Sequence, residues 1–486
     1  MDGEAGRGTL TALITSTVLI HPNGTMDVIA RWTQHDRVRH LGLLLGVAGA
    51  VRGVFALGVV ADMPLMADAQ AYHDAARQML RAFPGTEPYY WPPGLPYLLA
   101  LWYLPVGAEV WAARLFAVVV STVNVALIDG LARRMLSEER PARWAGWMAA
   151  VYPPSVLMTS QVVSQPLELT FLLAATIALL RGLRTDRWTW LAGAGLALGA
   201  GVLVRPSLLS VVAVLGGGAV VLAYRAVQET AAVSGQTAVG GALAGGLAVF
   251  AVLAPIAAHN HAQEAGWTLS TNNAYNLFLG NNPHTPPYKT NHLASRSGEA
   301  LPPEVRADLR SFDRSESPQA VMMAEVVRFV REHPGETLLR TTNRMREFWG
   351  FDYVASRRIQ IAYDLGLGGL VGLLMLEAGG YVVLMLLVLV GLVEGRIWRR
   401  RETALVGLLV AGYQIPYWVA FSAGTYHFTA VGLLLPLAAA GAATLDEVRR
   451  GRRTLRAPRI SAVAAGLFLL LQVEYAYFTY LYAPVG

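Results

Sequence analysis

The chain has 486 residues, a formal net charge of +6 and no cysteine. Hydrophobic residues make up 54% of it and charged residues only 15%, whereas soluble domains carry roughly a quarter charged residues. These numbers exclude disulfides, thiolate metal sites and thiol nucleophiles, and they favour a membrane protein anchored by arginines over a nucleic-acid-binding protein.

Residues 1–36 do not predict a folded element. The apolar stretch from Leu10 to Ile20 is too short to span a bilayer, and it lacks the basic flank and small-residue cleavage site of a signal peptide. We expect a disordered leader over residues 1–36, with Met26 as an alternative start of the protein.

Apolar runs of about twenty residues, the length that crosses a hydrocarbon core of roughly 30 Å, recur along the rest of the chain. They predict an all-α integral membrane protein with about eleven transmembrane helices, seven within residues 37–258 and four within 365–486. The predicted spans are 40–61, 109–131, 143–161, 166–182, 188–204, 207–225, 236–258, 365–393, 403–421, 427–445 and 460–482.

Arginine-rich segments follow the second, fourth, eighth and tenth spans. If eleven spans alternate in direction, all four segments lie on one side, and the positive-inside rule makes that side the cytoplasm. Two long segments, 62–108 and 259–364, then lie on the outer side, where long structured loops carry function. We therefore predict a multi-pass protein of the plasma membrane whose active site faces the periplasm or exterior.

The first outer loop, 62–108, opens with an amphipathic helix. Apolar side chains, Tyr72 among them, recur at helical spacing, while polar residues including His73 face away. Asp68 lies at the helix start, where it either caps the helix or is placed for chemistry on a lipid-borne substrate. The aromatic and proline-rich stretch that follows, residues 89–97, suits a membrane interface.

The second outer loop, 259–364, has an irregular first half and a helical second half. Asn272 and Asn276 flank Tyr275, and their amides can either bind sugar hydroxyls or satisfy loop backbone. We favour the first reading, in which residues 270–290 form a flap that faces the acceptor.

Short motifs follow one another in a fixed order over residues 40–445. They are Asp68-x-x-x-Tyr72, Trp91-Pro92-Pro93-Gly94-x-Pro96, Arg205-Pro206, residues 270–283, residues 329–349 and Tyr426-His427. In this order they resemble the polyprenyl-phosphate-sugar-dependent glycosyltransferases of the GT-C fold. That family includes the bacterial protein mannosyltransferases and the lipid A aminoarabinose transferase.

Three motifs depart from the family pattern. The family's Ser-Glu-Pro before the fourth span reads Ser164-Gln165-Pro166, and the Arg of its Arg-Tyr-His is Thr425. Its Trp-x-x-Arg-Asn after the seventh span appears here as residues 256–260. Each departure removes a charge from a position where the family has one.

The resemblance implies an inverting transfer of a sugar from a polyprenyl phosphate to an acceptor hydroxyl, with Asp68 as general base. Arg205, at the outer end of the fifth span, is expected to line a cavity and bind the donor phosphate through its planar fork. The alternative is an interfacial arginine that reaches water. Arg52, inside the first span, is a second buried cation, either for the phosphate or for an internal ion pair.

The expected substrate-binding residues come from both outer loops and one late span. They are Tyr72, His73, Trp91, Asn272, Tyr275, Asn276, Tyr426 and His427. Asp62, Asp68, His73 and Asp74 could hold a divalent cation, but their spacing matches no strong metal motif, so we expect no required cofactor.

The expected partners are the lipid bilayer, the polyprenyl-phosphate sugar and an acceptor that is a protein, lipid or polysaccharide; we expect a monomer and no nucleic acid. The main competing interpretation is a transporter or flippase of a lipid-linked or anionic substrate. Transporters commonly show internal repeats and broken helices at mid-membrane, and the sequence shows no repeat between its halves. A non-catalytic scaffold is a third interpretation, which leaves the acidic first loop unexplained.

Overall fold

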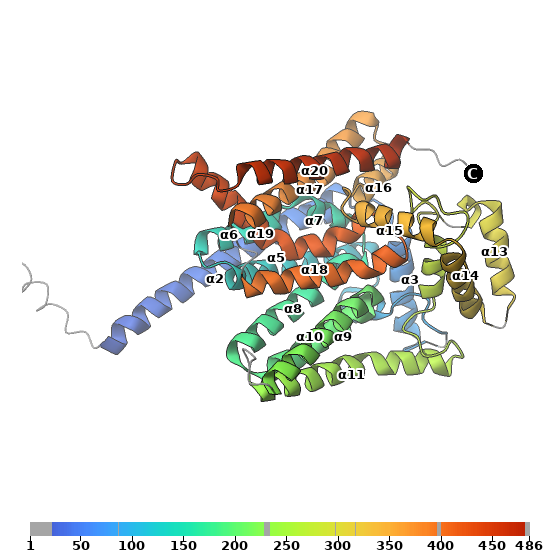
Figure 1. Ribbon diagram of the computed structural model, residues 1–486, viewed down its shortest axis with the longest axis horizontal. Helices are drawn as coiled ribbons and strands as arrows, with labels where there is room; N and C mark the ends of the chain where they lie inside the picture. The colour runs from blue at the N-terminus through green and yellow to red at the C-terminus, as the bar shows by residue number, and fades with distance from the viewer. Residues whose placement is uncertain are drawn as a thin grey trace, which may run out of the picture.

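The structure, a computed structural model, describes residues 22–481 apart from 86, 228–233, 297, 316 and 396–399. The described residues are almost entirely helical and contain no strand. The long helices run side by side, and shorter helices collect at one end of the bundle (Figure 1).

A helix, or a pair of short helices, occupies each predicted span. They are α2 (Pro22–Val54), α5 (Val110–Met135), α6 (Glu139–Val151) with α7 (Pro153–Leu157), α8 (Ser164–Thr185), α9 (Trp188–Val204), α10 (Leu209–Val227), α11 (Gly241–Ala262), α17 (Leu367–Gly395), α18 (Arg401–Val419), α19 (Phe428–Arg449) and α20 (Pro458–Ala476). Seven helices within the described residues are long and apolar enough to cross a membrane. The total of about eleven spans stays a prediction.

The first helix begins earlier than expected. Residues 22–36 are helical, which corrects the prediction of a disordered leader there, while residues 1–21 lie outside the described part of the chain. Pro22 stands at the first helical position, which suits proline, and no further proline follows until Pro64. The helix of the first span therefore continues towards the N-terminus without a break.

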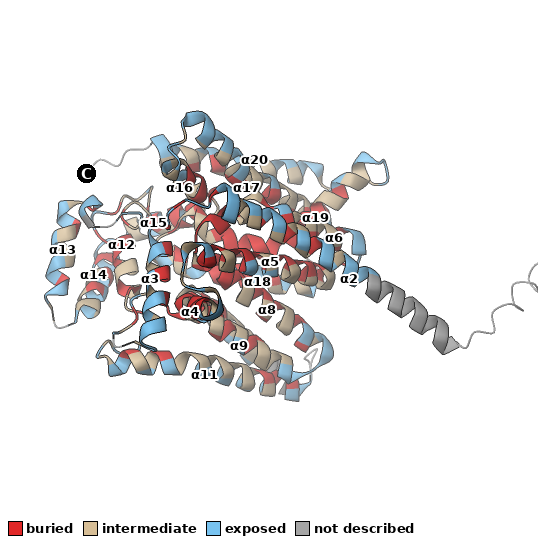
Figure 2. Ribbon diagram, turned by 180° about the vertical axis from the view of Figure 1, so that it is seen from behind, coloured by how far each residue is buried: buried red, intermediate tan, exposed pale blue. Residues whose placement is uncertain are grey.

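The outer loops form the remaining helices. They are α3 (Asp68–Arg81), α4 (Gly94–Val106), α12 (Asn273–Gly280), α13 (Pro303–Asp313), α14 (Pro318–Glu332), α15 (Pro334–Phe348) and α16 (Val354–Ala362). Helices α3 and α12 to α16 gather at one end of the bundle (Figures 1 and 2). Helices from the two long loops of the sequence therefore share one end of the molecule.

The arginine-rich connections meet at the other end. Arg184, at the end of α8, donates to the Arg134 carbonyl at the end of α5 (2.8 Å) and to Glu402 at the start of α18 (2.8 Å). Arg140 pairs with Asp446, near the end of α19, at 2.6 Å. These contacts join segments that the alternation of spans places on one side; the full topology stays a prediction.

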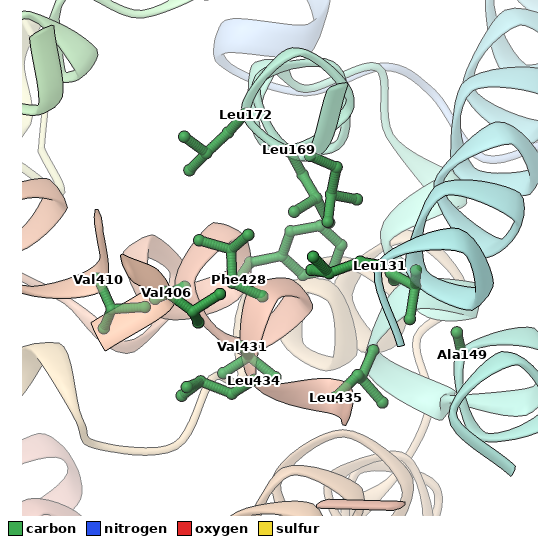
Figure 3. Packing of buried hydrophobic residues seen from close by; sticks show 14 of the residues in the cluster. Leu131, Ala149, Leu169, Leu172, Val406, Val410, Phe428, Val431, Leu434 and Leu435 are labelled. Atoms are coloured by element: carbon green, nitrogen blue, oxygen red, sulfur yellow. The ribbon is translucent and has the colours of Figure 1, made fainter. Parts of the chain in front are cut away.

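The core of the bundle is built around α19, the most enclosed of the long helices. Figure 3 shows Phe428 and Val431 of α19 among Leu169 of α8 and Val406 of α18. Gly391 of α17 lies so close to α19 that a Cβ would sit 2.1 Å from the Leu437 carbonyl oxygen. Small residues thus let α17 and α19 approach closely, the usual packing of helices in membranes.

Helices α11 and α20 lie at opposite edges of the bundle (Figure 2). In each of these two helices, only 11% of the most apolar stretch is buried inside the protein. Side chains such as Phe250 and Leu470 remain exposed at 68% and 66%. Such apolar outer faces suit contact with lipid.

Candidate active site

Asp68 is the first residue of α3 and its side chain is exposed. The residue at the cap position is Ala67, with φ +50° and no side-chain cap hydrogen bond. A positive φ is uncommon outside glycine, so the chain makes a sharp change of direction immediately before Asp68. Asp68 accepts no hydrogen bond within the described residues, so the capping interpretation does not account for its carboxylate.

Tyr72 follows one helical turn after Asp68 and is buried at 5% exposure. Its hydroxyl lies close to the Ser164 side chain, and its ring meets Trp91 edge-on with 5.8 Å between centroids. Burial first, and the Asp68 charge second, raise the pKa of Tyr72 to about 12. The phenol therefore stays neutral and links the α3 start to the interior.

Arg205 lies in the turn between α9 and Pro206, where the chain is extended and the helix ends. Its Nε is 3.6 Å from the Glu168 carboxylate, while Nη1 donates to Ser164 Oγ (2.9 Å) and Nη2 to the Tyr417 hydroxyl (3.3 Å). The Tyr426 ring covers the guanidinium at 5.3 Å. These contacts hold the side chain against the protein interior, so it is not an anchor that reaches freely into water.

Glu168 is the carboxylate that sequence reasoning missed. It is completely buried and accepts hydrogen bonds of 2.9 Å from Ser207, Tyr413 and Thr429. The family pattern has a glutamate at the position of Gln165. Glu168 lies one helical turn further along the chain. The sequence did hold a signal for Glu168, because a glutamate three residues after Gln165 lies on the same helix face as the missing acid.

Asp68 and the Arg205 cluster are neighbours. Tyr72 and Tyr426 each lie within electrostatic reach of both Asp68 and Arg205. Tyr90, half exposed, lies close to Asp68 and to Tyr275 of α12. The structure thus brings together Asp68, Tyr72, Trp91, Arg205 and Tyr426 from the predicted set.

The two predicted histidines do not join this cluster. His73 is buried, with Nδ1 2.6 Å from the Tyr103 hydroxyl, which corrects its assignment to the polar face of α3. The apolar stripe of that helix includes it because it lies at i+4 from Ala69. His427 is also buried, hydrogen-bonded to the Phe348 carbonyl (3.0 Å) and stacked on Tyr381. Both therefore serve packing.

Arg52 is a structural residue. It is fully buried, and it donates to Ser121 Oγ (2.7 Å) and to the carbonyls of Ala149 (2.9 Å) and Ala150 (2.6 Å). Those carbonyls belong to the last turn of α6, where a helix leaves acceptors without intrahelical partners. Arg52 therefore caps the C-terminal end of α6, in place of the phosphate contact or ion pair expected from the sequence.

The predicted flap contacts the first outer loop, because the Thr271 amide donates to the Tyr89 carbonyl at 2.9 Å. Asn272 is buried and its amide oxygen accepts from Ser270 Oγ (3.1 Å), so it serves the loop itself. Tyr275 and Asn276 are partly exposed on α12. Of the three predicted residues, Tyr275 and Asn276 keep side chains that are partly exposed.

One polar stripe of α15 holds this flap in place. Arg344 donates to the Gly280 carbonyl (2.6 Å), Asn343 to the Pro287 carbonyl (2.8 Å), and Glu347 accepts from the Thr290 amide (2.9 Å). Arg340 adds a bond to the Asn282 carbonyl (2.9 Å). Positions 340, 343, 344 and 347 share one helix face, so a single side of α15 fixes residues 280–290.

The suggested cation ligands do not assemble. His73 turns inward to Tyr103, and Asp74 on the exposed face accepts a hydrogen bond from Gln70 (2.9 Å). Across the described ranges no three histidine or acidic side chains are grouped as a metal site would require.

The fold and site of the described residues together define a helical membrane protein with an exposed carboxylate beside a partly buried arginine paired with a buried glutamate, at its loop-bearing end. Residues 91–259 match the family model described as dolichyl-phosphate-mannose-protein mannosyltransferase. The matched range contains Trp91, Glu168 and Arg205. The match supports a membrane glycosyltransferase of the GT-C type, the class that the motifs resembled.

Among solved structures the chain is similar to the Archaeoglobus fulgidus oligosaccharyltransferase. The crystal structure tethered with an acceptor peptide containing the NVT sequon via a disulfide bond has 13% identity and a TM-score of 0.45, covering 92% of this chain and 56% of that one. The apo form has 12% identity and a TM-score of 0.43, covering 90% and 56%. The complex with Zn and sulfate has 13% identity and a TM-score of 0.42, covering 89% of this chain and 53% of that one.

This chain therefore spans just over half the length of that archaeal protein. A comparison with curated proteins finds no match.

Proposed function

We propose that the protein transfers a sugar from a polyprenyl-phosphate donor to an acceptor hydroxyl at the outer face of the plasma membrane, with inversion at the anomeric carbon. The observation that carries the proposal is the placement of Asp68. Its carboxylate is exposed and without a hydrogen-bond partner among the described residues, at the edge of a buried cluster that contains one arginine.

Asp68 acts as general base. The acceptor hydroxyl gives its proton to the carboxylate while its oxygen forms a bond to the anomeric carbon. The bond between that carbon and the phosphate oxygen breaks, and its electron pair leaves with the phosphate. A positioned base contributes typically about 10²–10⁴-fold to such a step. The leaving phosphate is a stable anion, so a second carboxylic acid to protonate it is unnecessary.

Arg205 receives the phosphate. Two of its nitrogens donate to the neutral hydroxyls of Ser164 and Tyr417, which can yield to or share with phosphate oxygens. Glu168 faces the remaining Nε and holds the guanidinium in orientation. The planar fork of arginine suits a phosphate in geometry and in charge.

The site draws its substrates from two directions. The apolar outer faces of α11 and α20 place the molecule among lipids, the environment of a polyprenyl chain. The acceptor, a protein, lipid or polysaccharide, approaches from the side of Tyr90 and α12, where Tyr275 is partly exposed. We propose a monomer as the active unit, since the mechanism uses residues of one chain.

Asp68→Asn tests the proposal. The variant keeps the shape of the side chain but loses the base, so transfer from radiolabelled polyprenyl-phosphate sugars to membrane acceptors should fall by at least about 10²-fold. Asp74→Asn is the matched control, because it makes the same change on the exposed face of the same helix. Retention of more than about a tenth of wild-type turnover in the Asp68 variant contradicts a general-base role.

A further inference from the structure

Helix α16 packs against the chain that leads into Asp68. Ala355 and Ile359 of α16 share an apolar cluster with Met63, and Met66 packs on the same cluster. Asp68 follows Met66 by two residues, and Arg358 lies next to Ile359. The start of α3 and the first turns of α16 are therefore neighbours, although about 290 residues separate them in sequence.

Two carboxylates hold the N-terminus of α16. Asp352 accepts from the amides of Tyr353 (2.8 Å) and Val354 (3.1 Å). Glu377 of α17 accepts from the next two amides, those of Ala355 (3.1 Å) and Ser356 (2.7 Å). A helix leaves its first amides without intrahelical acceptors, and these carboxylates supply them. Both carboxylates thereby bind backbone amides, and they fix the helix that carries Arg358.

Arg358 itself has no hydrogen bond and no close ion pair within the described residues, and it is partly exposed. Its guanidinium has five N–H donors, and donors near a protein interior normally find acceptors. Burial lowers the pKa of Arg358, and nearby carboxylates, Asp68 first among them, act in the opposite direction. A cation with uncommitted donors therefore lies within electrostatic reach of the proposed general base.

Arg358 and Arg205 are carried by elements on different sides of α3. Arg205 stands at the end of α9, among α8, α9 and α18, whereas α16 contacts α17 and α7. In both views α3 lies between α16 on one side and α9 on the other (Figures 1 and 2). Tyr72 and Tyr426 fill the side towards Arg205.

We infer that Arg358 forms an anion site for the acceptor, which carries a phosphate or carboxylate close to its reacting hydroxyl. The inference rests on the proposed function, because inverting transfer places acceptor and leaving phosphate on opposite faces of the sugar. With the donor phosphate at Arg205, the cation across Asp68 belongs to the acceptor side. The guanidinium fork pairs with two oxygens of either anion.

Anion binding without any donor tests the inference. The purified chain in phosphatidylcholine nanodiscs is titrated with glycerol 3-phosphate, glycerate and glycerol, three probes that differ in their anionic group. We expect the two anions to bind and glycerol not to. Arg358→Gln should weaken anion binding by at least about tenfold, the effect of losing one charged hydrogen-bonding partner. Arg358→Lys should give an intermediate loss because it keeps charge without the fork.

Arg357→Gln is the control, since this neighbouring arginine is exposed and hydrogen-bonds Gln360 on its own helix. It should bind both anions like the wild type, and unfolding curves of each variant without probe report on folding. Equal binding by Arg358→Gln and wild type, no anion binding by wild type, or a loss confined to Arg205→Gln overturns the inference. None of these results depends on transfer, so they leave the Asp68 test of the proposed function separate.

Discussion

Arginine side chains have different partners in two regions of the loop-bearing end. On α15, Arg340 and Arg344 are 0% and 1% exposed and donate mainly to backbone carbonyls of other segments. In the site, Arg205 faces a carboxylate and neutral hydroxyls, and Arg358 has uncommitted donors in the described structure. Backbone carbonyls are permanent partners, so the first pair builds the fold, and we propose that the second pair binds substrate anions.

The largest effect that this comparison predicts is on folding. Arg344→Met removes the donors for the carbonyls of Gly280, Trp418 and Val419. Each buried group left without a partner costs about 1–3 kcal/mol, so the free energy of unfolding should fall by several kcal/mol. Thermal unfolding and limited proteolysis of the outer loop measure this loss.

Arg331→Met is the control for that variant, because Arg331 is exposed on α14. It should unfold like the wild type. A fully stable Arg344→Met protein would remove the distinction between scaffold and site arginines.

A smaller effect, confined to transfer, is expected at Arg205. Arg205→Lys keeps the charge but loses the fork, so transfer at limiting donor should fall about tenfold, and Arg205→Ala should fall further. Donor KM and turnover should change more than acceptor KM. If the Lys variant matches wild type at limiting donor, the bidentate phosphate contact is wrong.

The Ala variant leaves Glu168 buried without its cation, which destabilises a protein independently of catalysis. The double variant Arg205→Ala with Glu168→Gln removes both charges and should recover folding. Transfer by the double variant should stay low, because the phosphate contact is still missing.

The smallest effect is a pH dependence in the α15 region. Burial raises the pKa of Glu347 to about 7, against hydrogen bonds from Thr290. A carboxyl with a raised folded-state pKa stabilises the fold at low pH, and this stability is lost as pH rises towards the folded pKa. Between pH 6 and 8 the free energy of unfolding should fall by about 1.4 kcal/mol.

Chemical denaturation across that pH range measures the slope. Glu347→Gln should flatten it, since the amide does not titrate and can still accept from the Thr290 amide. If the Glu347→Gln variant keeps the wild-type change of unfolding free energy with pH, another group causes the pH dependence.

Helix positions were predictable because they depend on local information. The predicted span 188–204 coincides with α9, and 166–182 lies within α8. The length and hydropathy of an apolar run determine where a span lies. The arginine-rich segments between spans predict which side of the membrane each end faces. The break between α6 and α7 was not predicted, since Pro153 and Pro154 lie inside an apolar run that reads as one span.

Site membership was only partly predictable. Asp68, Tyr72, Arg205 and Tyr426 were named from ordered motifs, and the structure brings them together. His73 and His427 were named for their chemistry, but each hydrogen-bonds a buried partner that periodicity does not reveal. A polar residue on a helix can face either the site or the core, and the neighbouring elements decide which.

By itself the sequence determined that this chain is a helical membrane protein, where its helices lie, and that Asp68 begins a helix in the first outer loop. Tertiary structure alone decided the charge partners. Glu168 meets Arg205 across 37 positions, and Asp352 and Glu377 fix the helix that brings Arg358 to Asp68. The negative charge that is missing at Gln165 has a counterpart in Glu168, because electrostatics depends on distance in space and not on position in the chain.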